Sequence, residues 1–66
     1  MNVTPIQLVT LRAISNLQKM GLPCTDEIRT AAAPIVEIGW VVEKEDGELH
    51  VPDDIKWRLL AAGQVL

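Results

Sequence analysis

The segment from Trp40 to Val51 constrains the fold of this chain more than any other. Two runs of alternating apolar and polar residues flank the dipeptide Asp46-Gly47, a pattern typical of a β-hairpin. A two-residue type I′ loop needs a positive φ at both central positions, which Asp tolerates and Gly adopts freely. The sequence therefore predicts a hairpin over about 40–51 with a loop of two residues.

That loop length determines which side chains share a face of the hairpin. It pairs Lys44 with Leu49 and Val42 with Val51, and side chains alternate between the two faces along each strand. We expect one apolar face, toward the core, and one acidic face, toward solvent. The apolar face holds Trp40, Val42, Leu49 and Val51, and the other holds Val41, Glu43, Glu45, Glu48 and His50.

Three helices are predicted around the hairpin. Thr4-Pro5 followed by Gln7 forms a capping box with proline at the first helical position, and it begins a helix over about 4–20. Thr25 begins a second helix over about 25–33, and Asp53 begins a third over about 53–62.

Pro34 decides where the second helix ends. Proline inside a helix removes a hydrogen bond at a cost of about 3 kcal/mol, and it disfavours helical geometry in the residue before it. We expect the helix to end near Ala33, with a short turn over 34–38 closed by Gly39. A single kinked helix through Pro34 is the alternative.

The first helix has apolar residues on two sides. Leu8 and Leu11 project among polar side chains. Isolated exposed leucines are common, but the pair also fits a second packing surface, or a ridge that contacts a partner or a second copy. The larger group is expected to face the core and consists of Ile6, Val9, Ala13, Ile14, Leu17 and Met20.

Trp57 lies on the third helix, between Lys56 and Arg58. The chain has two tryptophans and no Phe or Tyr, so it has few large residues with which to build a core. Packing of Trp57 against the hairpin is therefore favoured. Tryptophan is also among the commonest anchors of protein interfaces, and this is the alternative.

The predicted fold is α+β, a single small domain over 1–66 with the order helix–helix–β-hairpin–helix. Ile38-Gly39-Trp40-Val41 leads into the hairpin, and Thr25-Asp26-Glu27-Ile28 begins the second helix. With these two motifs the chain resembles the winged helix-turn-helix family, and the resemblance implies a reduced winged helix. Only ten residues separate Ile28 from Gly39, where that family has a full recognition helix, so its DNA contacts are not carried over.

Charge argues against nucleic acid as the partner. The net charge is −3, but all nine acidic residues lie between Asp26 and Asp54. That span holds only two basic residues, Arg29 and Lys44, so its charge is −7. Neutralising phosphates supplies much of the affinity of a protein for DNA. An acidic hairpin is attracted instead to a basic protein surface.

Catalysis, metal ions and cofactors are not expected. Cys24 and His50 are the only cysteine and histidine, and their spacing suits neither a metal site nor a catalytic pair. No apolar run approaches the roughly 20 residues of a membrane span, and the first residues do not form a signal peptide. We expect a cytoplasmic protein that is not an enzyme, holds no cofactor and does not enter a membrane.

The predicted function is a small, acidic, non-catalytic protein-interaction module that binds a basic surface of nucleic-acid-handling machinery. In size and charge the chain resembles inhibitor proteins of phages and mobile elements, including anti-CRISPR proteins. The predicted partner-binding residues are an acidic group, Glu43, Glu45, Asp46, Glu48, Asp53 and Asp54, and an apolar group, Leu8, Leu11 and Trp57.

Two other functions remain as alternatives. A small winged-helix DNA-binding transcriptional regulator would use Arg12, Lys19, Lys56 and Arg58, which must then lie on one surface. A homodimer held together by the apolar group is the third candidate.

Overall fold

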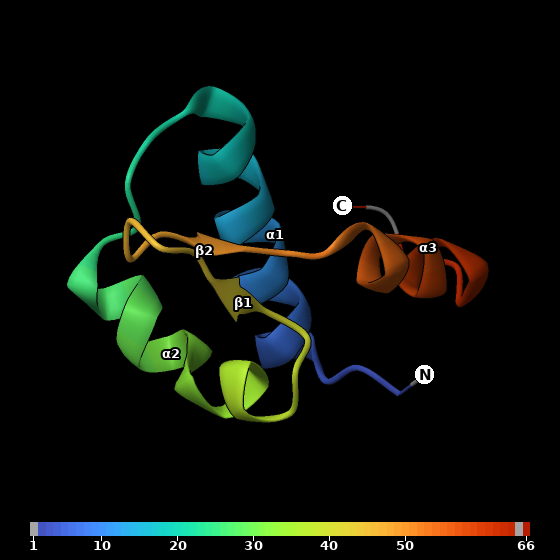
Figure 1. Ribbon diagram of the computed structural model, residues 1–66. Coiled ribbons are helices and arrows are strands. Elements are labelled where there is room, and N and C mark those ends of the chain that lie inside the picture. The colour runs from blue at the N-terminus through green and yellow to red at the C-terminus, as the bar shows by residue number, and fades with distance from the viewer. Residues whose placement is uncertain (1, 65) are drawn as a thin grey trace.

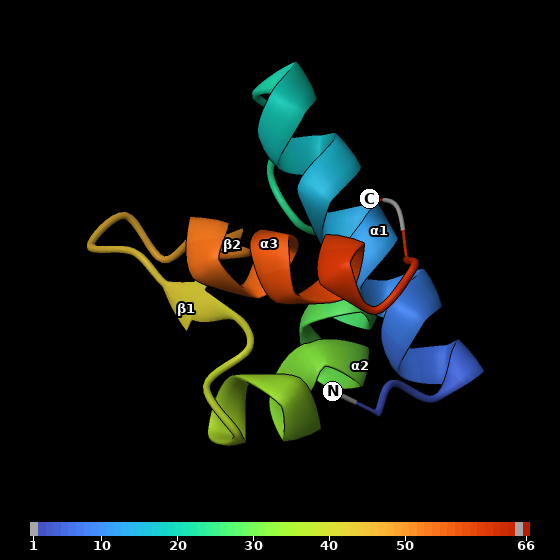
Figure 2. The same cartoon turned by 90° about the vertical axis from the view of Figure 1, so that its right-hand side faces the viewer.

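The computed structural model describes residues 2–64 and 66. Its order is α1 (Pro5–Met20), α2 (Asp26–Glu37), β1 (Val42–Glu43), β2 (Leu49–His50) and α3 (Asp53–Ala61), with the two strands antiparallel (Figure 1). This confirms the predicted α+β fold with helix–helix–hairpin–helix order. Helix α1 contacts both α2 and β2, while α3 lies at the far end of the molecule from the hairpin loop (Figures 1 and 2).

Both ends of α1 are formed by local sequence chemistry. The Thr4 hydroxyl accepts a hydrogen bond from the Gln7 N–H at 3.2 Å, and the Gln7 side-chain oxygen accepts one from the Thr4 N–H at 2.9 Å. The helix ends at Met20, and the φ of 69° at Gly21 turns the chain so that the Leu22 N–H donates to the Leu17 carbonyl oxygen at 2.9 Å. The bounds of α1 therefore need no contact from elsewhere in the chain.

The buried face of α1 differs from the expected one. Leu11 and Ile14 are fully buried, whereas Ile6, Val9 and Met20 are 78%, 65% and 63% exposed. Because α1 is apolar around most of its circumference, its periodicity allowed two orientations. The helix buries the side that faces α2 and β2.

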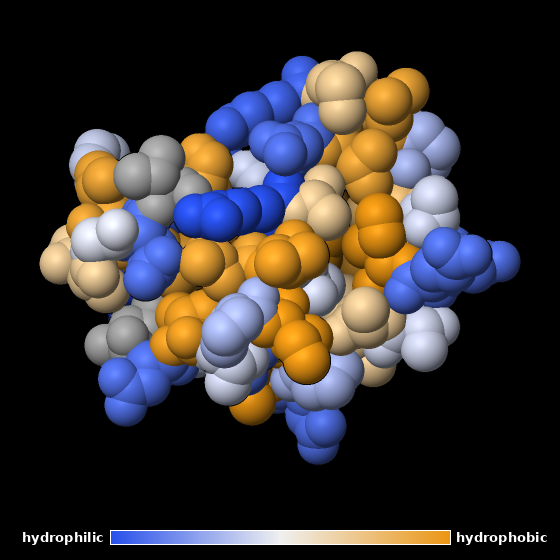
Figure 3. All heavy atoms as spheres, turned by 180° about the vertical axis from the view of Figure 1, so that it is seen from behind, coloured by the Kyte–Doolittle hydropathy of each residue, from blue (hydrophilic) through white to orange (hydrophobic). Residues whose placement is uncertain are grey.

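This orientation removes the predicted Leu8–Leu11 ridge. Leu11 belongs to the core and Leu8 is half-buried, so the ridge as a partner-binding surface is wrong. For Leu11 the alternative, packing inside the domain, is right. Of the residues expected in the core, Ile14 is buried and Ala13 and Leu17 are half-buried, whereas Ile6, Val9 and Met20 are exposed. Seen from behind, the molecule shows hydrophobic side chains gathered across the α1 side (Figure 3).

Helix α2 continues through Pro34 to Glu37, so its expected end at Ala33 with a turn over 34–38 is wrong. The side chains on both sides of the proline, Ala32 and Ile35, are fully buried. Burying a residue such as isoleucine contributes about 1.5–3 kcal/mol, which is comparable with the cost of about 3 kcal/mol for an interior proline. Packing in the core therefore outweighs the local preference to end the helix.

The hairpin register differs by one residue from the predicted one. Val42 pairs with His50 and Glu43 with Leu49, which leaves a three-residue loop over 45–47. Among the loop residues only Gly47 has a positive φ, 83°, so the loop is not type I′. Gly47 donates to the Lys44 carbonyl oxygen at 2.9 Å, as in three-residue loops that end on a glycine in the left-handed region.

The new register exchanges the two faces of the first strand. Val41 is buried together with Leu49 and Val51, whereas Val42 is exposed. Glu43 now shares a face of the hairpin with Leu49. His50 pairs with Val42, whereas the predicted register paired it with Glu43. The core consists of Leu11, Ile14, Ala32, Ile35, Val41, Leu49, Val51, Ile55 and Leu59.

Helix α3 contributes two buried residues, Ile55 and Leu59, and leaves its other side exposed. Its N-cap is Pro52 without a side-chain hydrogen bond, so Asp53 is in the first turn and is not the expected cap. Trp57 is 69% exposed, and the favoured expectation that it packs against the hairpin is wrong. Trp57 is a surface residue.

Replacing Pro34 by alanine tests the continuity of α2. Alanine restores an N–H that can donate to the Thr30 carbonyl oxygen, and it removes the clash of the proline ring. The greater freedom of the unfolded chain offsets part of this gain. We therefore expect the free energy of unfolding to rise by about 1–2 kcal/mol. The measurement is the midpoint of urea unfolding, with Pro23→Ala in the preceding loop as the control. A loss of stability in Pro34→Ala would contradict a continuous helix.

Candidate functional site

Glu48 is bound inside the fold and is not a free acid on the hairpin. Its carboxylate accepts a hydrogen bond from the Cys24 N–H at 3.0 Å and one from the Arg29 guanidinium at 3.3 Å. The Glu48 and Arg29 side chains are each 33% exposed. Glu48 thus connects the hairpin to the loop before α2 and to α2 itself. The expectation that it belongs to the free acidic face is wrong.

The other predicted acids are exposed but do not form one surface. Glu43, Glu45 and Asp46 lie on the hairpin, where an Asp46 carboxylate oxygen also accepts a hydrogen bond from the Glu48 N–H at 2.9 Å. Asp53 and Asp54 lie at the start of α3, which is at the other end of the molecule from the hairpin loop (Figure 1).

A hollow of about 310 Å³ lies between α2 and the hairpin. Ala33, Val36 and Leu49 line it with apolar surface, and Glu37 and Glu43 line it with carboxylates. Neither carboxylate forms an ion pair with another residue that the structure describes. We call this site the acidic hollow. Arg29 also lines it, but Glu48 holds and neutralises its guanidinium.

Glu37 is the residue of this hollow that the sequence reasoning missed. It was expected in an irregular turn, whereas it occupies the last turn of α2. The helix dipole disfavours a negative charge in the last turn, and no basic residue lies there to compensate. An acid in the last turn is a signal that could have drawn attention to Glu37 once α2 is known to reach it.

The outer face of α2 is also acidic. Asp26 and Glu27 in its first turn are exposed, as is Glu37 in its last. The only basic residue of α2, Arg29, is bound to Glu48. These acids and those of the hairpin lie between Asp26 and Glu48, where the basic residues are Arg29 and Lys44.

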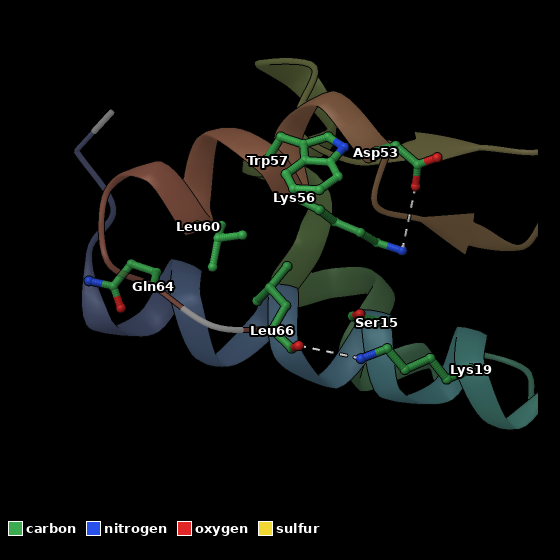
Figure 4. A pocket seen from close by; sticks show the side chains of 8 residues that line it. All are labelled: Ser15, Lys19, Asp53, Lys56, Trp57, Leu60, Gln64 and Leu66. Atoms are coloured by element: carbon green, nitrogen blue, oxygen red, sulfur yellow. Dashed lines mark hydrogen bonds and ion pairs between the residues drawn. The ribbon is translucent and has the colours of Figure 1, made fainter.

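A second hollow, of about 370 Å³, lies between α1 and α3 (Figure 4). Two lysines line it, Lys19 from α1 and Lys56 from α3, so we call it the basic groove. Of the predicted apolar group only Trp57 is found here, because Leu11 is in the core. The residues that line it are Ser15, Lys19, Asp53, Lys56, Trp57, Leu60, Gln64 and Leu66.

The four cations of the DNA-binding alternative are not gathered in one hollow. Lys19 and Lys56 share the basic groove, whereas Arg58 lines a different hollow with Trp40. Arg12 is exposed on α1. The structure therefore places Arg58 in a different hollow from the two lysines.

No family model, no curated protein and no solved structure matches the chain. The resemblance to winged helices stays a prediction. Within residues 2–64 and 66, no helix is long and apolar enough to cross a membrane. The same residues contain no group of three or more His, Cys, Asp or Glu side chains placed to hold a metal ion.

Substituting Glu48 tests its structural role. Glu48→Ala removes an ion pair worth less than about 1 kcal/mol and leaves the Cys24 N–H without its acceptor, so we expect a loss of about 1–2 kcal/mol in the free energy of unfolding. The exposed neighbour Glu45→Ala serves as the control and should change it by less than about 0.5 kcal/mol. Equal effects in urea unfolding would show that Glu48 does not link the hairpin to α2.

Proposed function

We propose that this protein is a non-catalytic protein-interaction module, and that its acidic hollow binds a lysine or arginine side chain on the basic surface of a partner protein. The observation that carries the proposal is the composition of this hollow. An apolar floor of Ala33, Val36 and Leu49 is bordered by Glu37 and Glu43.

That composition matches the two parts of a long basic side chain. Lysine and arginine have an apolar stem that packs on apolar surface and a charged end that stays at the rim. In the acidic hollow the stem would lie on Val36 and Leu49, and the cation would lie between the carboxylates of Glu37 and Glu43. Hydrogen bonds between ionised groups of this kind are stronger than those between neutral groups.

The acids around the hollow support the same proposal through their longer-range field. Glu45 and Asp46 extend the negative charge along the hairpin, and Asp26 and Glu27 extend it along α2. A surface of one charge raises the rate at which a partner of opposite charge associates, and salt weakens this effect. We therefore expect a basic partner whose association slows as the salt concentration rises.

The same charges favour protein over DNA as the partner. In a winged helix, the helix before the wing reads the major groove, and here that helix is α2. Its exposed face carries Asp26, Glu27 and Glu37, which repel phosphates. The expected role as an inhibitor, of the phage or anti-CRISPR type, stays a prediction. Such an inhibitor would act by covering a basic nucleic-acid-binding surface.

A small basic peptide tests the acidic hollow directly. We expect acetyl-Leu-Lys-Leu-Arg-amide to shift the backbone amide NMR signals of Ala33, Val36 and Glu43 in a saturable way at low salt. Glu37→Gln combined with Glu43→Gln should weaken this binding about tenfold, since each exposed ion pair contributes up to about 1 kcal/mol.

Asp53→Asn combined with Asp54→Asn is the matched control, because it changes the net charge equally on α3 and should leave the affinity unchanged. If both double variants weaken binding to the same extent, only the overall charge matters and the hollow is not the site. If duplex DNA shifts the signals of the native protein and the peptide does not, the DNA-binding alternative is favoured.

A further inference from the structure

The basic groove between α1 and α3 has an uncovered apolar wall. Trp57 and Leu60, both on α3, are 69% and 52% exposed, and Figure 4 shows their side chains over the groove with Leu66 between Leu60 and α1. A large aromatic side chain held at the surface by a helix is the kind of residue that anchors protein interfaces. From α1, Ser15 and Lys19 line the groove with polar groups.

The floor of the groove contains a buried hydroxyl without a partner. Ser15 is fully buried, and its Oγ has no hydrogen-bond partner among the described residues. Hydroxyls inside helices commonly donate to the carbonyl four residues earlier, as Thr10 does to Ile6 and Thr30 does to Asp26, each at 2.9 Å. Leaving a buried hydroxyl unpaired is unfavourable. Figure 4 shows the Ser15 hydroxyl on the side of α1 that faces the groove.

The two lysines of the groove have hydrogen-bond donors to spare. Lys19 Nζ donates to a main-chain oxygen of Leu66 at 3.3 Å. Lys56 Nζ lies 4.0 Å from a carboxylate oxygen of Asp53, whose side chain is 91% exposed, so this ion pair is weak. Each ammonium group has three donors. An anion placed between α1 and α3 would find unused donors on both lysines.

We propose that the basic groove binds an acidic peptide segment of a partner protein, in which a carboxylate lies next to a large apolar side chain. The carboxylate accepts hydrogen bonds from Lys19 and Lys56, and the apolar side chain packs on Trp57 and Leu60. When the Leu66 side chain turns aside, a peptide oxygen accepts the hydrogen bond of Ser15.

Charge and groove size favour a peptide over other anionic ligands. Single-stranded nucleic acid needs a positively charged track along its backbone, whereas this groove offers two lysines with the exposed carboxylate of Asp53 beside them. A lipid chain needs a longer apolar channel than the surface of Trp57, Leu60 and Leu66. The groove lies on a different side of the fold from the acidic hollow and has the opposite charge, so this inference does not rest on the proposed function.

The two tryptophans provide a readout with an internal control. Each indole N–H gives its own NMR signal; Trp57 lines the basic groove, whereas Trp40 lines the hollow that contains Arg58. We expect acetyl-Leu-Glu-Leu-amide to shift the Trp57 indole signal saturably and to leave that of Trp40 in place. The same peptide with glutamine in place of glutamate should bind about tenfold more weakly, since it cannot form charged hydrogen bonds with the lysines.

Variants of the groove separate binding from folding. Lys19→Gln combined with Lys56→Gln should weaken binding of the glutamate peptide about tenfold, whereas Lys44→Gln combined with Arg58→Gln, an equal loss of charge elsewhere, should not. Ser15→Ala should weaken binding several-fold while the midpoint of urea unfolding stays the same or rises, because the variant removes an unpaired buried hydroxyl.

Three results would overturn the inference. The first is a Trp57 indole signal that neither peptide moves. The second is equal affinity for the glutamate and glutamine peptides. The third is a short oligothymidylate that moves the Trp57 signal at lower concentration than the glutamate peptide, which would identify the groove as a site for nucleic acid.

Discussion

The register of the hairpin is the constraint on which the rest of this structure depends. Gly47 ends a three-residue loop, and the side chain that follows, Glu48, reaches Arg29 and the Cys24 N–H. Leu49 then enters the core. The same register brings Glu43 beside Leu49. One residue of slip would send Glu43 to the opposite face, and the acidic hollow would lose one of its two carboxylates.

The two candidate sites lie on different sides of one small core. A chain of 66 residues buries only about 60% of the surface that its unfolded form exposes, so many apolar side chains stay outside. Their surroundings differ. Between α2 and the hairpin they are bordered by Glu37 and Glu43, and between α1 and α3 they are bordered by Lys19 and Lys56. The fold thus presents two apolar hollows with rims of opposite charge.

Sequence reasoning succeeded where local chemistry decides and failed where distant contacts decide. The capping box at Thr4 and the glycine that ends α1 act within a few residues, and so they could be predicted. The Asp46-Gly47 turn was also recognisable, but a loop of two or of three residues can end on such a glycine. Burial of Ile35 beyond Pro34, and of Leu11 in α1, depends on packing between elements.

The candidate sites were harder to predict than the fold for the same reason. The bond between Glu48 and Arg29 joins residues 19 positions apart, and neither the acidic hollow nor the basic groove is formed by one element. Three of the predicted partner-binding residues line these hollows with exposed side chains: Glu43 lines the acidic hollow, and Trp57 and Asp53 line the basic groove.

The hairpin register decides whether Glu43 reaches the acidic hollow, and NMR measures that register most directly. Lys44 donates to the Glu48 carbonyl oxygen, so the next pair, Glu43 and Leu49, is not hydrogen-bonded and its α-carbons lie close together. The account predicts a strong contact between the α-protons of Glu43 and Leu49. A strong contact between those of Lys44 and Leu49 would contradict it.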